Sequence, residues 1–280
     1  MDAFFVLLLA SVLGQIQGAF PGMFPYEWQT CRECMPITCG LPRNPWDRHG
    51  RTYGGDGSSR GRYPWHAVIY ANGVPIGGGA LISCKLVLTT AYLVQDHSTQ
   101  ELLVKLGKVD MQRTSPTERT FKVFQKSLHP LWNPDKDLYS NDLALLLLER
   151  EVDFESSNGF INTVCLPPAL SDAKGWLTLT GFGYDLSGRK MNTMQELNIK
   201  KLPQDLCPLF RNKPHNFCGL GTDAGICAGD RGNPIVQITP SGQFMLVGVS
   251  NDYQCKAGGT DVYTQVSFFL DFVCNAPIVP

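Results

Sequence analysis

Cys227-Ala-Gly-Asp-Arg-Gly-Asn-Pro234 is the stretch that decides the fold of this chain, once it is taken together with seven other short blocks. The seven blocks are Pro64-Trp65, Gly78-Gly-Ala-Leu-Ile-Ser83, Val87-Leu-Thr-Thr-Ala91, Asp142-Leu-Ala-Leu-Leu146, Val164-Cys-Leu-Pro167, Thr180-Gly-Phe-Gly183 and Val262-Tyr-Thr-Gln-Val266. Each block alone is a weak signal. All eight in this order across Tyr53–Val266 form a specific pattern.

Short β-type runs lie within and between these blocks, separated by turn signals such as Asn72-Gly73. The predicted strands of a first group are His66–Tyr70, Gly79–Ser83, Leu86–Thr90, Leu102–Leu106, Thr120–Ser127 and Leu143–Leu148. Those of a second group are Leu177–Thr180, Gln195–Lys201, Pro234–Thr239, Phe244–Val249 and Asp261–Val266. Ser267–Cys274 mixes apolar with polar positions and predicts a closing helix. An all-β chain with these groups fits two barrels or a sandwich, and the pattern alone does not choose between them.

The eight blocks together resemble the signature of chymotrypsin-like serine proteases, the trypsin type included. The resemblance implies two packed six-stranded antiparallel β-barrels, a short C-terminal helix, and an active-site cleft where the barrels meet. It places this domain at residues 52–276.

The N-terminal part of the chain predicts export. An apolar run, Ala3–Leu13, is too short to span a bilayer, and the small residues that follow favour cleavage after Gly18, so residues 1–18 read as a signal peptide. Residues 19–51 are rich in Pro, Cys and aromatic residues and are expected to form an extension held by disulfides. Ten cysteines fit an oxidising, extracellular location. A formal charge of −1 gives no electrostatic reason to expect nucleic-acid or membrane binding.

The catalytic positions that the resemblance identifies hold the wrong side chains for hydrolysis. This chemistry needs a serine nucleophile, a histidine base and an aspartate that orients the histidine. The histidine position is Tyr92 and the serine position is Arg231, while the aspartate is retained as Asp142. A phenol is no base at neutral pH and a guanidinium is no nucleophile. None of the five histidines stands at a triad position.

The resemblance also identifies remnants of the surrounding machinery. The backbone of Gly229 and Arg231 matches the oxyanion hole, and Arg51-Thr52 matches an activation cleavage site whose new amine would pair with Asp230. This site could be a working cleavage switch or the relic of one, and the sequence leaves both open. Insertion of Thr52 would bury a hydroxyl that needs a hydrogen-bond partner.

The specificity pocket should be acidic or collapsed. The resemblance places Gly225 and Asp261 at its floor and Ser250-Asn-Asp252 along its wall. We favour collapse, with Arg231 turned onto Asp252, Asp261 or Asp142, because a buried charge must find a partner.

The cysteines pair by resemblance as Cys39–Cys165, Cys207–Cys218 and Cys227–Cys255. Of the four left over, Cys84–Cys274 and a small Cys31–Cys34 loop are expected, because C-x-x-C here lacks the context of a redox or zinc motif. Two disulfides of the family are absent, and both cysteines of each are replaced. Gly77 and Leu93 stand at the two positions of one, and Leu177 and Gln237 at those of the other.

The expected function is therefore binding without hydrolysis, with no metal or cofactor. By analogy the chain is similar to the protease-like homologues of arthropod haemolymph and venom, which implies a cofactor, decoy or regulator that binds proteases or their substrates. The alternatives are a serine endopeptidase with an atypical site and an extracellular ligand carrier that uses the acidic cleft.

Overall fold

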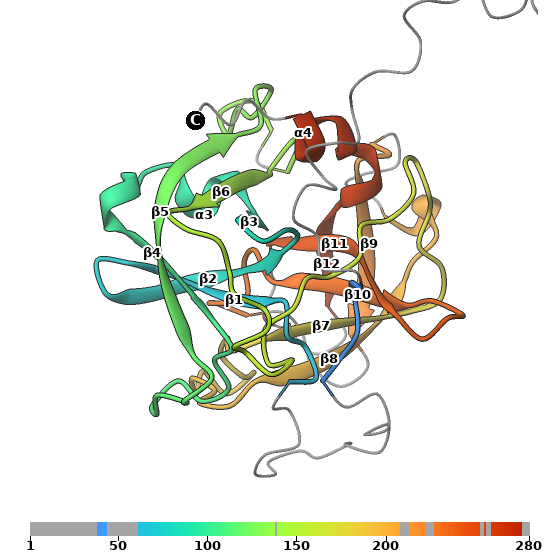
Figure 1. The fold of residues 1–280 in the computed structure, drawn as a ribbon. Coiled ribbons are helices and arrows are strands. Elements are labelled where there is room, and N and C mark those ends of the chain that lie inside the picture. Colours follow the sequence, from blue (N-terminus) through green and yellow to red (C-terminus); the bar gives the residue numbers. More distant parts are fainter. Residues whose placement is uncertain are drawn as a thin grey trace, which may run out of the picture.

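The computed structural model describes residues 38–43, 61–137, 139–207, 213–221, 227–252, 255 and 259–275. Within these residues the strands close into two six-stranded antiparallel barrels (Figure 1). The fold predicted by the resemblance is therefore confirmed, and the sandwich is excluded.

The first barrel has the strand order β1-β2-β3-β6-β5-β4. Its strands are β1 (His66–Ala71), β2 (Val74–Leu81), β3 (Leu86–Thr89), β4 (Leu102–Leu106), β5 (Arg119–Leu128) and β6 (Ala144–Leu148). Asn72 and Gly73 join β1 to β2 with positive φ angles of 50° and 80°, as a two-residue hairpin turn requires. Leu102, Val104 and Leu106 of β4 are fully buried, which is the alternation that a closed barrel demands.

The second barrel has the order β10-β11-β12-β9-β8-β7. Its strands are β7 (Trp176–Gly181), β8 (Gln195–Lys201), β9 (Asn216–Gly221), β10 (Pro234–Ile238), β11 (Phe244–Asp252) and β12 (Thr260–Gln265). The last described elements are a 3₁₀ turn, η4 (Val266–Phe268), and a helix, α4 (Leu270–Asn275), where one helix was predicted. Leu270 and Val273 of α4 belong to the same buried cluster as the first-barrel core.

Strand β9 was not predicted. Its sequence, Asn-Phe-Cys-Gly-Leu-Gly, has two glycines and no β-branched residue, so propensity argues against a strand. Antiparallel pairing with β12 on one edge and β8 on the other holds these residues in a strand despite their low propensity. Short helical turns α3 (Ala91–Val94), η2 (Thr99–Glu101) and η3 (Gln204–Leu206) also went unpredicted.

An aromatic cluster fastens the barrels together. Phe244 of β11 packs against Tyr63 and Trp65, which precede β1, with ring centroids 5.5 and 5.2 Å apart. Trp65 is fully buried. The junction therefore continues the hydrophobic core, and loops on one side of it carry the positions that the sequence singled out.

Candidate functional site: a filled catalytic cleft

The structure brings the three triad positions together. Tyr92 lies in α3, just after β3, and Asp142 lies two residues before β6, so both come from the first barrel. Arg231 lies in the loop that leads into β10 of the second barrel. The backbone of this loop is tied to the first barrel, because the Gly78 N–H donates to the Arg231 carbonyl at 3.0 Å.

Asp142 sits at the bottom of this arrangement and is fully buried. Its Oδ1 accepts the backbone N–H of Tyr92 at 2.7 Å, and its Oδ2 accepts the side-chain amide of Asn251 at 3.0 Å. Thr264 in turn donates to Asn251 Oδ1 at 2.7 Å and fixes that amide. Burial raises the pKa of Asp142 to about 6, although the Tyr92 N–H and the Arg231 charge oppose the rise. Asn251 is a functional neighbour that the sequence placed only in a pocket wall.

Arg231 fills the space beside Asp142. Its Nη1 lies 3.7 Å from Asp142 Oδ2, and its guanidinium carbon lies 4.1 Å from the centroid of the Tyr92 ring. The Arg231 side chain is 11% exposed, whereas Tyr92 is 41% exposed and covers it from the solvent side. A cation held between a carboxylate and an aromatic face is a stable arrangement, and none of these three side chains is the serine or the histidine of a Ser-His-Asp triad.

Comparison with known families assigns the fold. The trypsin family model matches residues 52–273. The chain belongs to the trypsin family. Curated relatives include mannan-binding lectin serine protease 1 of Mus musculus, 29% identical over 77% of this chain and 33% of that protein. The human protein of the same name is 28% identical over 86% of this chain and 37% of that protein. Serine protease filzig of Drosophila melanogaster is 30% identical over 82% of this chain and 14% of that protein. The chain thus spans about a third or less of the length of these relatives.

The loop before Arg231 turns tightly at Gly229. Gly229 has φ +87°, and a Cβ there would lie 3.2 Å from the Gly183 Cα, so glycine suits this position. Asp230 is 8% exposed and points away from the cleft into hydrogen bonds with Gly183, Cys227 and Asn233. Burial raises the pKa of Asp230 to about 7. Arg51 and Thr52 lie outside the described residues.

The pocket of this trypsin-family member is described in part. Ser250 and Asp261 are buried, while Gly225 and the side chain of Asp252 lie outside the described residues. Asp261 is close enough to Asp230 for its charge to raise the pKa of that carboxyl further. Arg231 forms an ion pair with Asp142, one of the three acids considered as its partners.

Three disulfides match the expected pairs. They join Cys39 to Cys165, Cys207 to Cys218 and Cys227 to Cys255. Cys84 and Cys274 are each disulfide-bonded as well, but the bonds between described residues do not include one that joins these two. Cys31 and Cys34 lie outside the described residues.

Gly77 and Leu93, which stand where the family has a bracing disulfide, pack against each other. Gly77 and Leu93 are adjacent, because a Cβ on Gly77 would lie 2.9 Å from both Leu93 methyl groups. The leucine side chain fits here only because the facing residue is glycine. The support for α3 is therefore apolar packing where the family has a covalent bond.

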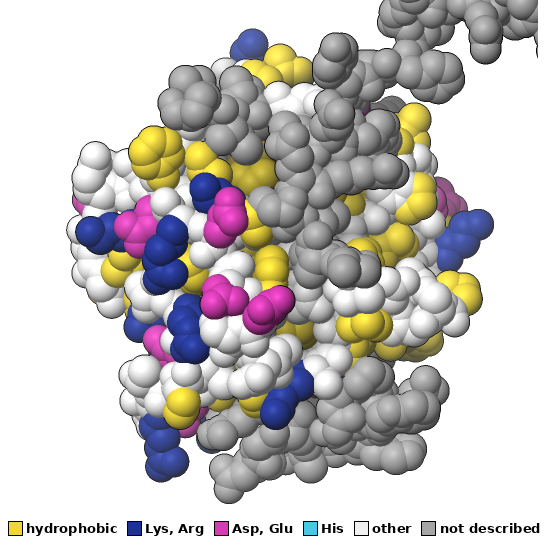
Figure 2. All heavy atoms as spheres, viewed as in Figure 1, with side chains coloured by type: hydrophobic (Ala, Val, Ile, Leu, Met, Phe, Trp, Pro, Cys, Tyr) yellow, Lys and Arg dark blue, Asp and Glu magenta, His cyan; other side chains and the backbone are white. Residues whose placement is uncertain are grey.

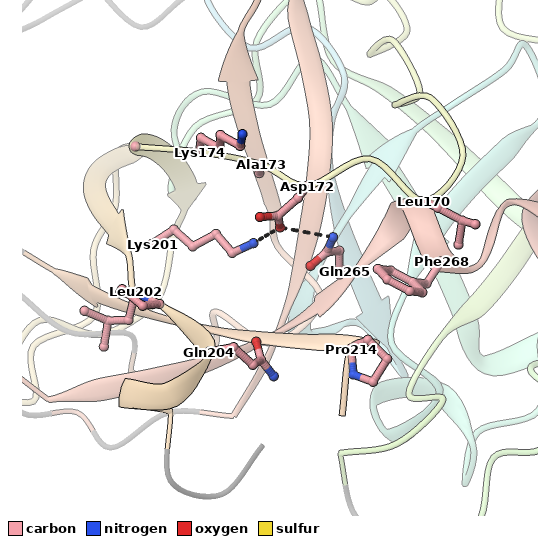
Figure 3. A pocket seen from close by; sticks show the side chains of 12 residues that line it. Leu170, Asp172, Ala173, Lys174, Lys201, Leu202, Gln204, Pro214, Gln265 and Phe268 are labelled. Carbon is pink, nitrogen blue, oxygen red and sulfur yellow. Dashed lines mark hydrogen bonds and ion pairs between the residues drawn. The ribbon is translucent and has the colours of Figure 1, made fainter. Parts of the chain in front are cut away.

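The described surface also has a pocket that lies away from the triad positions. A pocket of about 630 Å³ lies on the second barrel between Leu170, Lys201, Gln204 and Phe268, where Lys201 and Gln265 both reach Asp172 (Figure 3). None of the triad positions lines it. Among described residues there is no cluster of three or more metal-ligating side chains, and no helix there is long and apolar enough to cross a membrane. Figure 2 shows basic and acidic side chains interspersed on the face that it draws.

Proposed function

We propose that this chain is a secreted, non-catalytic member of the trypsin family that acts by binding other proteins. The observation that carries the proposal is Arg231 itself, whose guanidinium stands between Asp142 and the Tyr92 ring. A hydrolase needs an open position at this point for its nucleophile and its substrate carbonyl. Here a permanently charged side chain fills that position.

Three features support export. The apolar run Ala3–Leu13 is followed by small residues typical of a signal peptide. The chain has ten cysteines, and the described cysteines are all disulfide-bonded. Disulfides persist in oxidising compartments.

The proposed partners are proteins of an extracellular proteolytic cascade, either proteases or their substrates. The curated relatives are named as serine proteases, and the step from their names to partners of this chain is an analogy. The role is then that of a cofactor, decoy or regulator.

Labelling with a serine-directed fluorophosphonate, read by intact mass, tests the loss of catalysis. We expect no adduct on the chain before or after cleavage at Arg51, with active trypsin as the positive control. A stoichiometric adduct would establish the rival function, a serine endopeptidase with an atypical site.

Capture from the native fluid, with identification of what is bound, tests the binding role. Enrichment of an identified protease or protease substrate supports the proposal. Co-purification of a small molecule alone, displaced by cleft substitutions such as Tyr92→Ala, would support the ligand-carrier alternative in its place.

A further inference from the structure

Asp230 has three hydrogen-bond donors, all from residues of the second barrel and its loops. Its Oδ1 accepts the Gly183 N–H at 3.1 Å and the Asn233 side-chain amide at 2.9 Å. Its Oδ2 accepts the Cys227 N–H at 3.2 Å. Both oxygens of this buried carboxylate therefore already have hydrogen-bond donors.

The Asn233 side chain reaches Asp230 through a narrow space between the two barrels. It is 1% exposed. A Cβ on Gly78 of β2 would lie 1.9 Å from Asn233 Oδ1, and a Cβ on Gly181 of β7 would lie 2.1 Å from Asn233 Nδ2. The amide therefore lies between a glycine of the first barrel and a glycine of the second, and it fits only because both lack a side chain.

The backbone around Asn233 is fastened in the same way. The Gly232 N–H donates to the Ser250 carbonyl at 2.8 Å, and the Ser250 N–H donates to the Asn233 carbonyl at 3.0 Å. The Gly78 N–H donates to the Arg231 carbonyl at 3.0 Å, and Thr89 donates to the Gly78 carbonyl at 2.7 Å. The loop that carries Arg231 is thus held from both barrels.

We propose that Asn233 is an internal clamp that fixes the cleft without any cleavage of the chain. Its amide supplies to Asp230 the contact that a new N-terminal amine would otherwise supply. The proposal rests on the proposed function and concerns its regulation: the loop that carries Arg231 is constitutively held in place, and cleavage at Arg51 does not switch it.

The energetics favour the clamp over an inserted amine. The Asn233 amide is tethered three residues from Asp230, so the contact requires ordering of a single side chain. An inserted terminus would have to order its own segment, bury a charged amine with the Thr52 hydroxyl, and compete with an amide already in place.

The experiment compares thermal unfolding of cleaved and uncleaved protein. The uncleaved reference is Arg51→Gln, and the cleaved form is made with a trypsin-like protease at Arg51. We expect the two Tm values to agree within about 1 °C. We expect Asn233→Ala to lower Tm by about 3–8 °C in both forms, since a buried carboxylate loses a donor. Asn198→Ala, at an exposed position on β8, is the matched control and should leave Tm nearly unchanged.

Chemical reactivity of the Thr52 α-amine gives a second measurement that needs no variant. In the cleaved protein this amine should react with cyanate at the rate of a free peptide. Protection of the amine, together with a Tm gain of several degrees on cleavage that Asp230→Asn abolishes, would overturn the clamp. Neither measurement involves a partner or a nucleophile, so failure of the clamp leaves the proposed function standing. A serine adduct, conversely, would remove the proposed function without changing either measurement.

Discussion

The guanidinium of Arg231 is stacked on the ring of Tyr92, 4.1 Å from its centroid, so the residues at the nucleophile and base positions contact each other directly. In an active enzyme these two positions exchange a proton. Here they share a cation–π contact, which requires the aromatic ring and the cation together. The two changes are therefore complementary: either one alone would leave its partner without this contact.

Replacement of Arg231 by methionine should destabilise the protein in a pH-dependent way. Asp142 would lose the positive charge that offsets its burial, so its pKa should rise above the present value of about 6. We expect a loss of about 1–3 kcal/mol in the free energy of unfolding at about pH 8, and a smaller loss at about pH 5, where the carboxyl is protonated. Chemical denaturation at the two pH values measures both. Lys85→Met, which breaks an exposed pair with Glu151 at 3.8 Å, is the control and should cost about 0–1 kcal/mol at either pH. An equal loss at both pH values would mean that Arg231 acts through packing and not through charge.

Asp142 should also shape the pH dependence of the unmodified protein. Its pKa is raised from 3.8 to about 6 in the folded state, so the folded protein holds a proton that the unfolded chain has released. The stability that this proton contributes is fully present below the unfolded value and is lost as pH rises through about 6, with a slope of at most about 1.4 kcal/mol per pH unit. Asp142→Asn should remove this component, while the component of Asp230, whose pKa is about 7, persists. Asp271→Asn, at an exposed position on α4, serves as the control. Parallel curves for Asp142→Asn and the parent protein would contradict the raised pKa.

The sequence predicted the barrels well because their signals are local. Ten of the strands coincide with predicted runs that have dense apolar and β-branched residues, or begin within a residue or two of them, whereas the Val74 half of β2 and all of β9 were missed. In β9 the fold overrides the low propensity of Gly219 and Gly221 by pairing on both edges. Such long-range pairing is not visible in a single run of residues.

The sequence predicted which residues stand in the cleft, but it did not predict which of them contact each other. Motif positions placed Tyr92, Asp142 and Arg231 in one cleft, since the family's geometry fixes where these backbones lie. Which acid Arg231 would meet depended on a rotamer, and the sequence left three candidates. The role of Asn233 was less visible still, because it depends on the empty space beside Gly78 and Gly181 in two different barrels.

Glu118, Lys105 and Lys108 form a charge cluster outside the cleft that should contribute to stability. Glu118 accepts Lys105 Nζ at 3.0 Å and Lys108 Nζ at 2.9 Å, and its side chain is 3% exposed. Burial alone would raise the pKa of Glu118, but the hydrogen bonds from Lys108 and Lys105 outweigh it and hold the pKa below its ordinary value. Glu118→Gln should therefore lower the free energy of unfolding by about 2–4 kcal/mol near neutral pH, because two ammonium groups lose their counter-charge. The contribution should be fully present above the unfolded pKa of 4.5 and be lost as pH falls through the lower pKa of the folded carboxyl.

Denaturant titration of Glu118→Gln measures that loss directly. Glu151→Gln is the control, since Glu151 pairs with Lys85 at 3.8 Å and is 66% exposed. The control should change stability by about 0–1 kcal/mol. If the two variants lose the same amount, the cluster around Glu118 behaves as an ordinary surface pair.

Cys39–Cys165 should hold the chain together after cleavage at Arg51. The bond links the extension to the domain across 126 residues, and a cut at Arg51 falls between its two ends. Non-reducing electrophoresis of the cleaved protein should show one band, and reduction should separate the two fragments. Cys39→Ser with Cys165→Ser is the matched variant. Peptide mapping of the same sample identifies the partners of Cys84 and Cys274, and separate bands without reductant would disprove the tether in the folded protein.

Restoration of the triad tests whether this site is a protease site that lacks two side chains. The surroundings of the missing base are in place, because Asp142 Oδ1 is already held by the Tyr92 N–H and its Oδ2 by Asn251. Tyr92→His would put an imidazole beside this carboxylate, and Arg231→Ser would empty the cleft and supply a hydroxyl. Triad members act as a unit, so each single variant should label no faster than the parent protein. The double variant should react with a fluorophosphonate at least about tenfold faster than either single variant, measured as adduct formation by intact mass.

The recovered rate should still be low, for reasons that lie in named contacts. Leu93 packs on Gly77 in place of a bracing disulfide, so the introduced imidazole would sit on a less rigid α3. Adding Asn233→Gly to the double variant should lower the labelling rate, because Asp230 then loses the side-chain amide that fixes the loop carrying residue 231. A folded double variant that shows no labelling would mean that the Gly229–Arg231 backbone no longer forms an oxyanion hole, and that the site has been rebuilt around its arginine.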